Sequence, residues 1–353
     1  MLMRISTRGL SAVLRVLGLG ILALLLASCS VDDPQNTLAA AGIVAKRQQD
    51  LFWIIIGIAA FVFVFVEGLL LVVVIVFRRR RGEQRLPAQT HGNTRLEVGW
   101  TIAPALILVF IAVPTVGTIF DLAARPAVAL DVKVTGYQWW WKFEYPGMGI
   151  VTANELHLPV GEFVSFDVTS NDVIHSFWMP KIAGKQDAVP GRINYLWARA
   201  DVPGEYYAQC AELCGIQHAL MGFRVIVQSR ADFEAWVKQQ QTPAAAPPAN
   251  VTSSITQCFA CHTIQGVPGA VGVIGPNLTH IGSRTTIVAG QLPNTTENLA
   301  AWLRNPQEIK VGTFMPGAEA PGEPLPGTKV GTAQLNLTSE QITALVSYLQ
   351  SLK

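Results

Sequence analysis

Two cysteine pairs, each followed by a histidine, are the residues of this sequence best suited to bind a metal or a cofactor. The second pair lies in Cys258-Phe259-Ala260-Cys261-His262. In a Cys-x-x-Cys-His motif the two thiols can form thioethers with the vinyl groups of a haem, and the adjacent imidazole can ligate the iron. The alternatives are a redox-active cysteine pair, which calls for a βαβ pattern absent from this segment, and half a zinc site. The motif therefore predicts a covalent haem c.

The first pair lies in a run that also holds an imidazole and a thioether. This run, the 210–221 loop, reads Cys210-Ala211-Glu212-Leu213-Cys214-Gly215-Ile216-Gln217-His218-Ala219-Leu220-Met221. A single blue-copper site uses one Cys, two His and a weakly bound Met, and a second thiolate is enough to bridge two copper ions. The second imidazole must come from elsewhere, and His175 in Asp172-Val173-Ile174-His175-Ser176-Phe177 is the upstream candidate.

Zinc is the main alternative at this loop. His175, Cys210, Cys214 and His218 would satisfy a tetrahedral zinc ion. That arrangement leaves Met221 without a role, and a β-sandwich does not need zinc to hold it together. A disulfide between Cys210 and Cys214 is a further alternative, but the whole ligand set favours copper.

The haem iron needs a second axial ligand. Met315, in Gly312-Thr313-Phe314-Met315-Pro316-Gly317, is the single methionine after residue 250, and its thioether would raise the reduction potential. His280 competes for the same role. We favour Met315 because the segment resembles class I cytochrome c, including Gly275-Pro276-Asn277-Leu278 between the two ligands.

Composition divides the 353-residue chain into a membrane part and a polar part. Hydrophobic residues make up 50% of it and charged residues 14%, against roughly 25% charged in a typical soluble domain. The apolar excess lies in the first 120 residues, which excludes a disordered chain or a plain cytosolic globule. The formal net charge of +2 gives no basic excess that would favour nucleic acid.

The first 28 residues have the pattern of a secretory signal, with Arg4, Arg8 and Arg15 before an apolar stretch at 16–26. The stretch ends in Leu26-Ala27-Ser28-Cys29, which resembles a bacterial lipoprotein box with Cys29 as the lipidated first residue. The alternative is an uncleaved anchor with an incidental cysteine.

Residues 29–126 are expected to hold a transmembrane hairpin in the bacterial plasma membrane. Its helices are predicted at about 51–77 and 100–120, each longer than the ~20 residues that cross a bilayer. A buried pair of soluble helices is the alternative. The loop between them holds Arg78-Arg79-Arg80-Arg81, Arg85 and Arg95, so the positive-inside rule makes it cytoplasmic. Cys29 and everything after Asp121 would then lie outside the cell.

The pattern from about residue 130 to residue 229 is that of short strands. Apolar residues alternate, as in Val164, Phe166 and Val168, and clusters such as Val189-Pro190-Gly191 separate the runs. This spacing indicates an all-β sandwich or barrel. Because a Cys-His-Met loop ends it, we predict a cupredoxin-like domain at 127–232.

A helical end and a Pro/Ala linker are predicted at 233–250, and an all-α domain of the class I cytochrome c type at 251–353. Thr338 is the expected N-cap of the last helix, with Gln341 three residues on. That helix is marked by helical spacing of apolar residues at Ile342, Leu345, Val346 and Leu349.

Together these segments resemble subunit II of a bacterial cytochrome c oxidase with a cytochrome c domain fused at its C-terminus. The most specific pieces are the 210–221 loop, the His175 segment, Gly136-Tyr137-Gln138-Trp139-Trp140-Trp141 and Lys185-Gln186-Asp187-Ala188-Val189-Pro190-Gly191-Arg192. The resemblance implies a dinuclear CuA centre held by His175, Cys210, Cys214, His218, Met221 and the backbone carbonyl of Glu212. The Glu212 carboxylate would help to bind Mg²⁺ or Mn²⁺ at the border with subunit I.

Two further residues acquire roles by this resemblance. Trp139 matches the tryptophan through which electrons reach the copper; a packed interfacial aromatic is the alternative. Glu97 matches a carboxylate at the cytoplasmic mouth of a proton path, whereas a lone Glu at a helix start would otherwise stabilise the helix dipole.

The resemblance implies an electron-input subunit of a proton-pumping oxidase. A donor such as cytochrome c or a bc-type complex would reduce the haem, and electrons would pass through CuA to subunit I, which reduces O₂ to water beside subunit III. Two membrane helices cannot house that oxygen chemistry themselves. The alternatives are a membrane-tethered electron carrier, the CuA domain of a denitrification reductase and a quinol oxidase subunit. The complete copper ligand set disfavours the quinol oxidase subunit.

Overall fold

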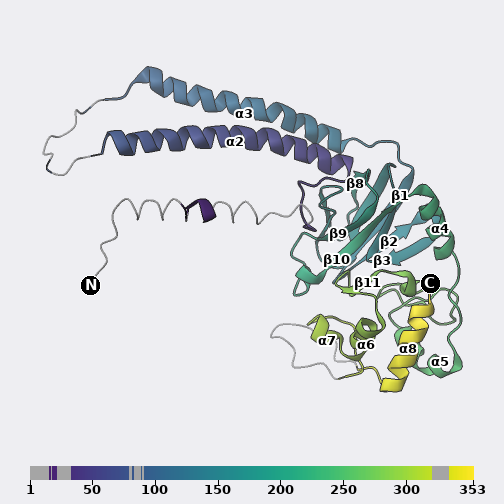
Figure 1. Cartoon of the computed structure of the whole chain (residues 1–353). Helices are drawn as coiled ribbons and strands as arrows, with labels where there is room; N and C mark the ends of the chain where they lie inside the picture. The colour runs from purple at the N-terminus through teal and green to yellow at the C-terminus, as the bar shows by residue number, and fades with distance from the viewer. Residues whose placement is uncertain are drawn as a thin grey trace, which may run out of the picture.

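The computed structural model describes residues 33–78, 91–319 and 334–353, together with residues 16, 18–21, 82 and 89. Figure 1 shows a pair of long helices, a β domain and a smaller helical domain. Cys29, most of the predicted signal segment and the arginines at 79–81 and 85 lie outside the described residues. The predictions made for them stay predictions.

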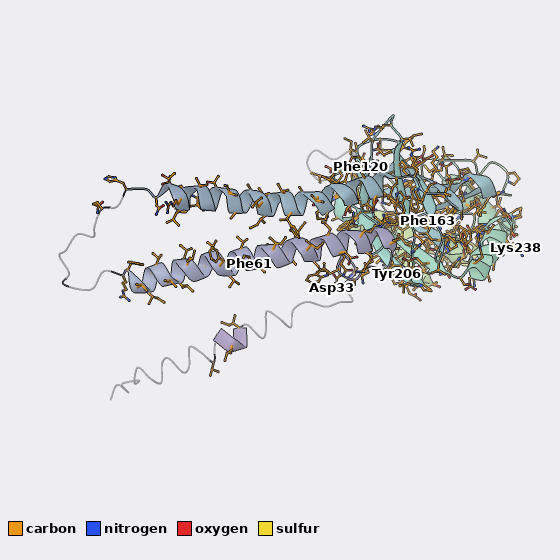
Figure 2. All side chains as sticks on the ribbon, turned by 90° about the horizontal axis from the view of Figure 1, so that it is seen from above. Asp33, Phe61, Phe120, Phe163, Tyr206 and Lys238 are labelled. Atoms are coloured by element: carbon orange, nitrogen blue, oxygen red, sulfur yellow. The ribbon has the colours of Figure 1, made fainter. Side chains whose placement is uncertain are left out.

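Two long apolar helices run side by side and extend away from the β domain (Figure 1). Helix α2 spans Ile43–Val76 and α3 spans Thr94–Ala123, and an 18-residue stretch within each has a mean hydropathy of 3.0 and 2.3, respectively. Both have the length and composition to cross a membrane. Their side chains, such as Phe61 of α2, are largely exposed (Figure 2), which fits contact with lipid or with another protein chain.

Both helices begin earlier than the apolar runs predict. The first turn of α2 packs on the β domain, where Val44 is buried and the Ile43 N–H donates to the Arg199 carbonyl at 3.0 Å. Helix α3 begins at Thr94 because the Asn93 side chain accepts hydrogen bonds from the N–H groups two and three residues later, at 3.1 and 3.3 Å. Packing and capping extend these helices beyond their membrane-length cores.

The β domain is a sandwich of two five-stranded sheets, with strand orders β3-β2-β1-β5-β8 and β4-β10-β9-β6-β7. Each sheet contains one parallel pair, β1 with β5 and β10 with β4. The predicted all-β sandwich is confirmed. Its strands are β1 Leu130–Tyr137, β2 Trp140–Tyr145, β3 Ile150–Ala153, β4 Glu155–Pro159, β5 Val164–Ser170, β6 His175–Trp178, β7 Lys185–Ala188, β8 Asn194–Ala198, β9 Gly204–Cys210 and β10 Gly222–Gln228.

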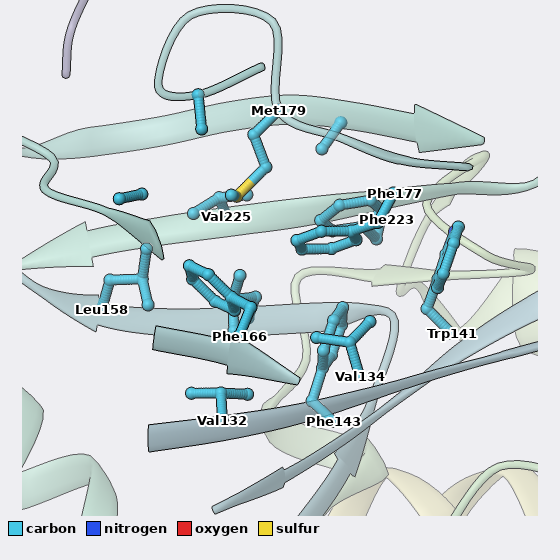
Figure 3. Packing of buried hydrophobic residues seen from close by; sticks show 14 of the residues in the cluster. Val132, Val134, Trp141, Phe143, Leu158, Phe166, Phe177, Met179, Phe223 and Val225 are labelled. Atoms are coloured by element: carbon cyan, nitrogen blue, oxygen red, sulfur yellow. The ribbon is translucent and has the colours of Figure 1, made fainter. Parts of the chain in front are cut away.

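Aromatic side chains fill the space between the two sheets (Figure 3). Phe177 and Phe223 stack with ring centroids 4.9 Å apart, and Trp141 meets them edge-on at 5.5 and 5.8 Å. Such pairs contribute about 0.5–1.5 kcal/mol beyond the area they bury. Because Phe177 belongs to β6 and Phe223 to β10, this packing also fixes the strands that flank the 210–221 loop.

The C-terminal domain is helical, as predicted, with one small hairpin that the sequence pattern did not predict. Its hairpin strands are β11 Thr286–Ile287 and β12 Leu292–Pro293. The predicted capping box is confirmed, since Thr338 and Gln341 exchange side-chain to backbone hydrogen bonds at the start of the last helix. The α-helices are α5 Ala249–Ile255, α6 Thr296–Arg304, α7 Pro306–Ile309 and α8 Ser339–Ser351.

The connection between the two domains is held to the helical domain by hydrogen bonds, although most of residues 241–250 are exposed. Helix α4, Arg230–Gln240, ends the β domain, with Ser229 as its N-cap. After it, the Ala244 N–H donates to the Gln265 carbonyl at 2.8 Å and the Tyr348 hydroxyl donates to the Ala245 carbonyl at 2.8 Å. The linker therefore lies against the helical domain that it leads into.

Candidate copper and haem centres

Strand pairing brings the candidate copper ligands together. Strand β9 ends at Cys210 and lies beside β6, which begins at His175, with Phe177 opposite Cys210. The 210–221 loop then folds back through the 3-10 helix η2, His218–Leu220, to start β10 at Gly222. Although His175 lies 35 positions before Cys210 in the sequence, the fold makes the two residues neighbours.

The ligand atoms predicted from the sequence converge on the two thiols. Cys210 Sγ and Cys214 Sγ are 3.8 Å apart. Cys210 Sγ lies 3.9 Å from His175 Nδ1 and 3.3 Å from the Glu212 carbonyl oxygen. Cys214 Sγ lies 3.7 Å from His218 Nδ1 and 3.8 Å from Met221 Sδ.

These distances discriminate between the alternatives for the pair. A disulfide has its sulfur atoms about 2.05 Å apart, so Cys210 and Cys214 are free thiols. The buried Met221 thioether lies in the same cluster, and sulfur-rich sets that include a thioether suit copper better than zinc. The donor set fits copper.

The protein also orients the first histidine. Asp172 Oδ1 lies 2.8 Å from His175 Nε2, which directs the other ring nitrogen, Nδ1, at Cys210. Gly136 lies against the same ring, since a Cβ there would come within 2.8 Å of His175 Cδ2. Hydrogen bonds from Cys214 and from His175 lower the pKa of the Cys210 thiol, while burial opposes them. A thiolate is therefore favoured at Cys210, whereas the hydrogen bond with Cys210 and burial raise the pKa of the Cys214 thiol.

Trp139 contacts the backbone of the 210–221 loop. Its indole Nε1 donates to the Cys214 carbonyl at 3.0 Å, and Gln138 Nε2 donates to the same oxygen at 2.7 Å. Trp139 is 7% exposed. The contact is compatible with both roles considered for Trp139. A packed aromatic residue and a residue that conducts electrons to the metal would each be buried against the 210–221 loop.

Glu212 and Glu97 lie on exposed parts of the molecule. The Glu212 carboxylate is on the outer side of the 210–221 loop beside Leu213, which is also exposed. Glu97 lies in the first turn of α3, where a negative charge stabilises the helix dipole. Neither geometry tests the role that the resemblance gives to the residue, so the metal at Glu212 and the proton path at Glu97 stay predictions.

The haem motif forms a tight turn after α5. Both the Cys261 and the His262 N–H donate to the Cys258 carbonyl, at 3.1 and 2.9 Å. His262 Nδ1 lies 2.7 Å from the Pro276 carbonyl, so Nδ1 donates and Nε2 is left to ligate iron. Burial lowers the pKa of His262, which favours the neutral imidazole that binds a metal. The residues fit a covalent haem.

The two candidates for the second axial ligand differ in their surroundings. Met315 is partly buried against the core of the helical domain. His280 is buried and its Nε2 lies 3.1 Å from the carbonyl of Gln240 at the end of α4. His280 thus contacts the end of the β domain through Nε2, while its buried Nδ1 has no hydrogen-bond partner among the described residues. Met315 as the second axial ligand stays a prediction.

Sequence reasoning missed two cations of the helical domain. Arg284 donates to the Asn277 carbonyl, and its buried Nε has no partner among the described residues. The charge of Arg284 also lowers the pKa of Glu155 across the domain contact. Lys310 is buried against the β domain. No local pattern identifies either residue, because each depends on packing between distant segments.

Three family models cover most of the chain. Residues 34–117 match the transmembrane domain of cytochrome c oxidase subunit II and residues 148–229 match its periplasmic domain. Residues 252–353 match cytochrome c.

Similar proteins carry the same description. Cytochrome c oxidase subunit 2 of Alkalihalophilus pseudofirmus is 36% identical over 351 residues, which covers 96% of this chain and 97% of that protein. Its counterpart in Bacillus sp. (strain PS3) is 38% identical, covering 95% and 96%. The crystal structure of the periplasmic domain of cytochrome oxidase subunit II from Bradyrhizobium japonicum is 35% identical over 33% of this chain and 96% of that one, with a TM-score of 0.32.

The fold and the matched domains define a membrane-anchored protein whose metal-binding β domain lies outside the membrane and is followed by a cytochrome c domain. The chain belongs to the cytochrome c oxidase subunit 2 family. It is therefore a subunit of a haem-copper oxidase.

Proposed function

We propose that this chain is the electron-input subunit of its oxidase, with a dinuclear CuA centre and a covalent haem c. The observation that carries the proposal is the convergence of thiol, imidazole, thioether and carbonyl ligands on Cys210 and Cys214, in one chain with a Cys-x-x-Cys-His domain. When bound, the two centres supply one-electron redox chemistry.

The ligands of each centre have defined tasks in this proposal. His175, Cys210, Cys214, His218, Met221 and the Glu212 carbonyl hold the copper pair. Cys258 and Cys261 attach the haem, and His262 and Met315 ligate its iron. Asp172 and the Pro276 carbonyl keep the ligating histidines in one orientation.

The proposal extends to the surroundings of the chain in the membrane. Helices α2 and α3 would both span the bilayer, giving a multi-pass protein with Glu97 on the cytoplasmic side at the mouth of a proton path. Subunits I and III would lie beside them, and electrons would leave the copper pair for subunit I, which couples oxygen reduction to proton translocation in the respiratory chain. The Glu212 carboxylate would share a Mg²⁺ or Mn²⁺ ion with subunit I.

The donor and the lipid anchor complete the proposal. The donor would be a soluble or membrane-bound electron carrier such as cytochrome c or a bc-type complex. Cleavage and lipidation at Cys29 would place the N-terminus on the same side as both metal domains, consistent with the positive-inside prediction for the loop between the helices.

The test is a cofactor analysis of the intact complex purified from membranes. We expect haem that stays on this chain after acid–acetone extraction, and an EPR signal from an electron shared by two copper nuclei. A zinc ion in place of the copper pair, or haem that is extracted from the chain, would contradict the proposal. Purification without a large haem-containing partner would instead indicate a membrane-tethered carrier.

A further inference from the structure

The cytochrome c domain lies on the β domain beside the candidate copper centre. The contact is made by residues 310–314, here named the docking segment. Gln217 of the 210–221 loop donates through Nε2 to the Val311 carbonyl. Gly312 packs on Ile216, since a Cβ at Gly312 would come within 2.9 Å of Ile216 Cγ2. The segment that precedes Met315 is thus held against the loop that carries the copper ligands.

Lys310 is the buried polar anchor of this contact. It is 4% exposed, and its Nζ donates to the carbonyls of Trp139 and Leu220 at 2.8 and 2.9 Å. Taking an ammonium group out of water is costly unless hydrogen bonds replace its hydration. Because both acceptors belong to the β domain, these hydrogen bonds are satisfied only when the two domains are docked in this geometry.

A second group of contacts joins β4 and the start of β10 to the helical domain. Glu155 of β4 accepts hydrogen bonds from the N–H groups of Thr285 and Thr286 at 2.7 and 3.0 Å. The Gly222 N–H, at the start of β10, donates to the Ala289 carbonyl at 3.1 Å. Two separated groups of contacts restrict rotation of one domain on the other.

Docking places an aromatic ring of one domain on an aromatic ring of the other. The Phe314 and Trp139 rings stack with centroids 5.3 Å apart and an interplanar angle of 12°. Trp139 in turn donates to the Cys214 carbonyl at 3.0 Å, and Phe314 directly precedes Met315 in the chain. Phe314, still 49% exposed, covers a Trp139 ring that is 7% exposed.

We propose that Phe314 is the bridging residue for electron transfer between the two centres, and that Lys310 is the positioning residue that keeps it stacked on Trp139. The inference rests on the proposed function, since it takes Met315 as an iron ligand and Cys214 as a copper ligand. The contacts then run without interruption from Met315 through Phe314 and Trp139 to Cys214. Electronic coupling falls more steeply across empty space than across bonded and van der Waals contacts, so a ring at this position matters for the rate.

The proposed transfer is balanced without any bond change. With both centres bound, it would oxidise the haem iron by one electron and reduce the copper pair by one electron. No proton is required by the Phe314 and Trp139 rings, which act as the medium and are themselves neither oxidised nor reduced. The residues of this chain set the distance between the two centres and the packing and orientation of the Phe314 and Trp139 rings between them.

The first experiment measures the rate of haem c oxidation by the copper centre in the intact complex, after photoreduction of the haem with a ruthenium dye. Phe314→Leu keeps an apolar side chain but removes the ring, and we expect the rate to fall severalfold. Phe314→Tyr keeps the ring and should restore the rate. Val202→Ala changes an apolar side chain of the β domain that is 50% exposed and lies outside the docking segment, and it should leave the rate unchanged.

A second readout separates bridging from positioning. Hydrogen exchange of the peptides covering 137–141 and 216–221 reports docking without any electron transfer. Phe314→Leu should leave their protection intact, whereas Lys310→Met should reduce both the protection and the rate. An unchanged rate in Phe314→Leu overturns the bridging role, and unchanged protection in Lys310→Met overturns the positioning role.

Failure of the inference is distinguishable from failure of the proposed function. If the unaltered complex shows no transfer from haem c to copper, the proposed function is wrong. If the unaltered complex transfers electrons and Phe314→Leu does so equally fast, the proposed function stands and the bridging role is wrong.

Discussion

At the scale of single residues, the two thiols of the candidate copper centre divide the other ligands between them. Cys210 is closest to His175 and to the Glu212 carbonyl, and Cys214 is closest to His218 and Met221. Since the sulfur atoms themselves are 3.8 Å apart, each thiolate can contact both ions of a pair. The bridging thiolates and the terminal thioether should therefore respond differently to substitution.

We predict that Cys214→Ser loses one copper ion or both, whereas Met221→Leu retains copper with a changed reduction potential and slower electron transfer. In the proposed centre the Cys214 thiolate would hold both ions, whereas a thioether is a weak ligand that tunes such a site. Copper content and EPR of the two purified variants check this. A full dinuclear signal in Cys214→Ser would show that Cys214 does not bridge.

Asp172 gives a second test at this scale. In the unaltered protein His175 Nε2 lies 2.8 Å from Asp172 Oδ1. Asp172→Asn keeps an oxygen atom near this ring nitrogen but removes the negative charge of the carboxylate. Loss of such an outer partner typically weakens metal binding by about 10–100-fold, and we expect a decrease in that range in a copper titration. Asp131→Asn is the matched control, because Asp131 bonds Ser165 away from the ligand set. Equal copper affinity in both variants would contradict an orienting role for Asp172.

Local sequence predicts the residues of this site better than it predicts their surroundings. The Cys-x-x-Cys-His motif and the 210–221 loop hold most ligands within a few positions, so spacing alone indicates their chemistry. His175 follows from the need for a second imidazole, and its place is set by the β6–β9 pairing. Lys310 could not be predicted, because a buried cation acquires its partners only when two domains meet.

At the scale of elements, apolar patterns predict which segments are helices and strands but not where those elements end. The membrane helices and the sandwich were predicted, whereas the first turn of α2 depends on tertiary packing and the start of α3 on the Asn93 cap. The short β11–β12 hairpin has two residues per strand, which is too short for alternation to be visible. Long periodic segments are the predictable ones.

Glu97 yields a prediction that belongs to α3. If it only stabilises the helix dipole, Glu97→Gln should cost at most ~1 kcal/mol of local stability and leave activity unchanged. If it collects protons for subunit I, oxygen consumption should fall severalfold while the rate of transfer from haem c to copper is unchanged. We expect the second result from measuring both rates in one Glu97→Gln preparation. Unchanged oxygen consumption would return Glu97 to a purely structural role.

At the scale of the whole molecule, the docking of the two extracytoplasmic domains depends on a buried carboxylate. Glu155 is 3% exposed. Burial raises its pKa, but hydrogen bonds from His157, Thr285 and Thr286 and the charge of Arg284 lower that pKa below its usual value. A carboxyl group with a lowered folded-state pKa stabilises the docked state above its unfolded pKa, and that contribution is lost as the pH falls.

We therefore predict that docking weakens as the pH falls below about 4.3, the ordinary pKa of a glutamic acid. Glu155→Gln should remove most of this dependence and cost about 1.5–3 kcal/mol at neutral pH, as for a buried hydrogen bond to a charged group. The pH dependence of docking is measured by the hydrogen exchange of residues 285–291, corrected for the intrinsic pH dependence of exchange. Glu162→Gln, which alters a carboxylate paired with Arg230 within the β domain, is the control. If docking in Glu155→Gln showed the same pH dependence as docking in the unaltered protein, the prediction would be contradicted.

The central claim is that electrons enter this chain at haem c and leave it through the copper centre. The most direct test is a single kinetic trace on the unaltered complex, in which the haem is photoreduced and the haem and copper absorbances are followed together. We predict that copper reduction proceeds with the same rate constant as haem c oxidation and precedes reduction of the acceptor in subunit I. Copper that stays oxidised while haem c remains reduced, or copper reduction that precedes haem reduction, would contradict the claim.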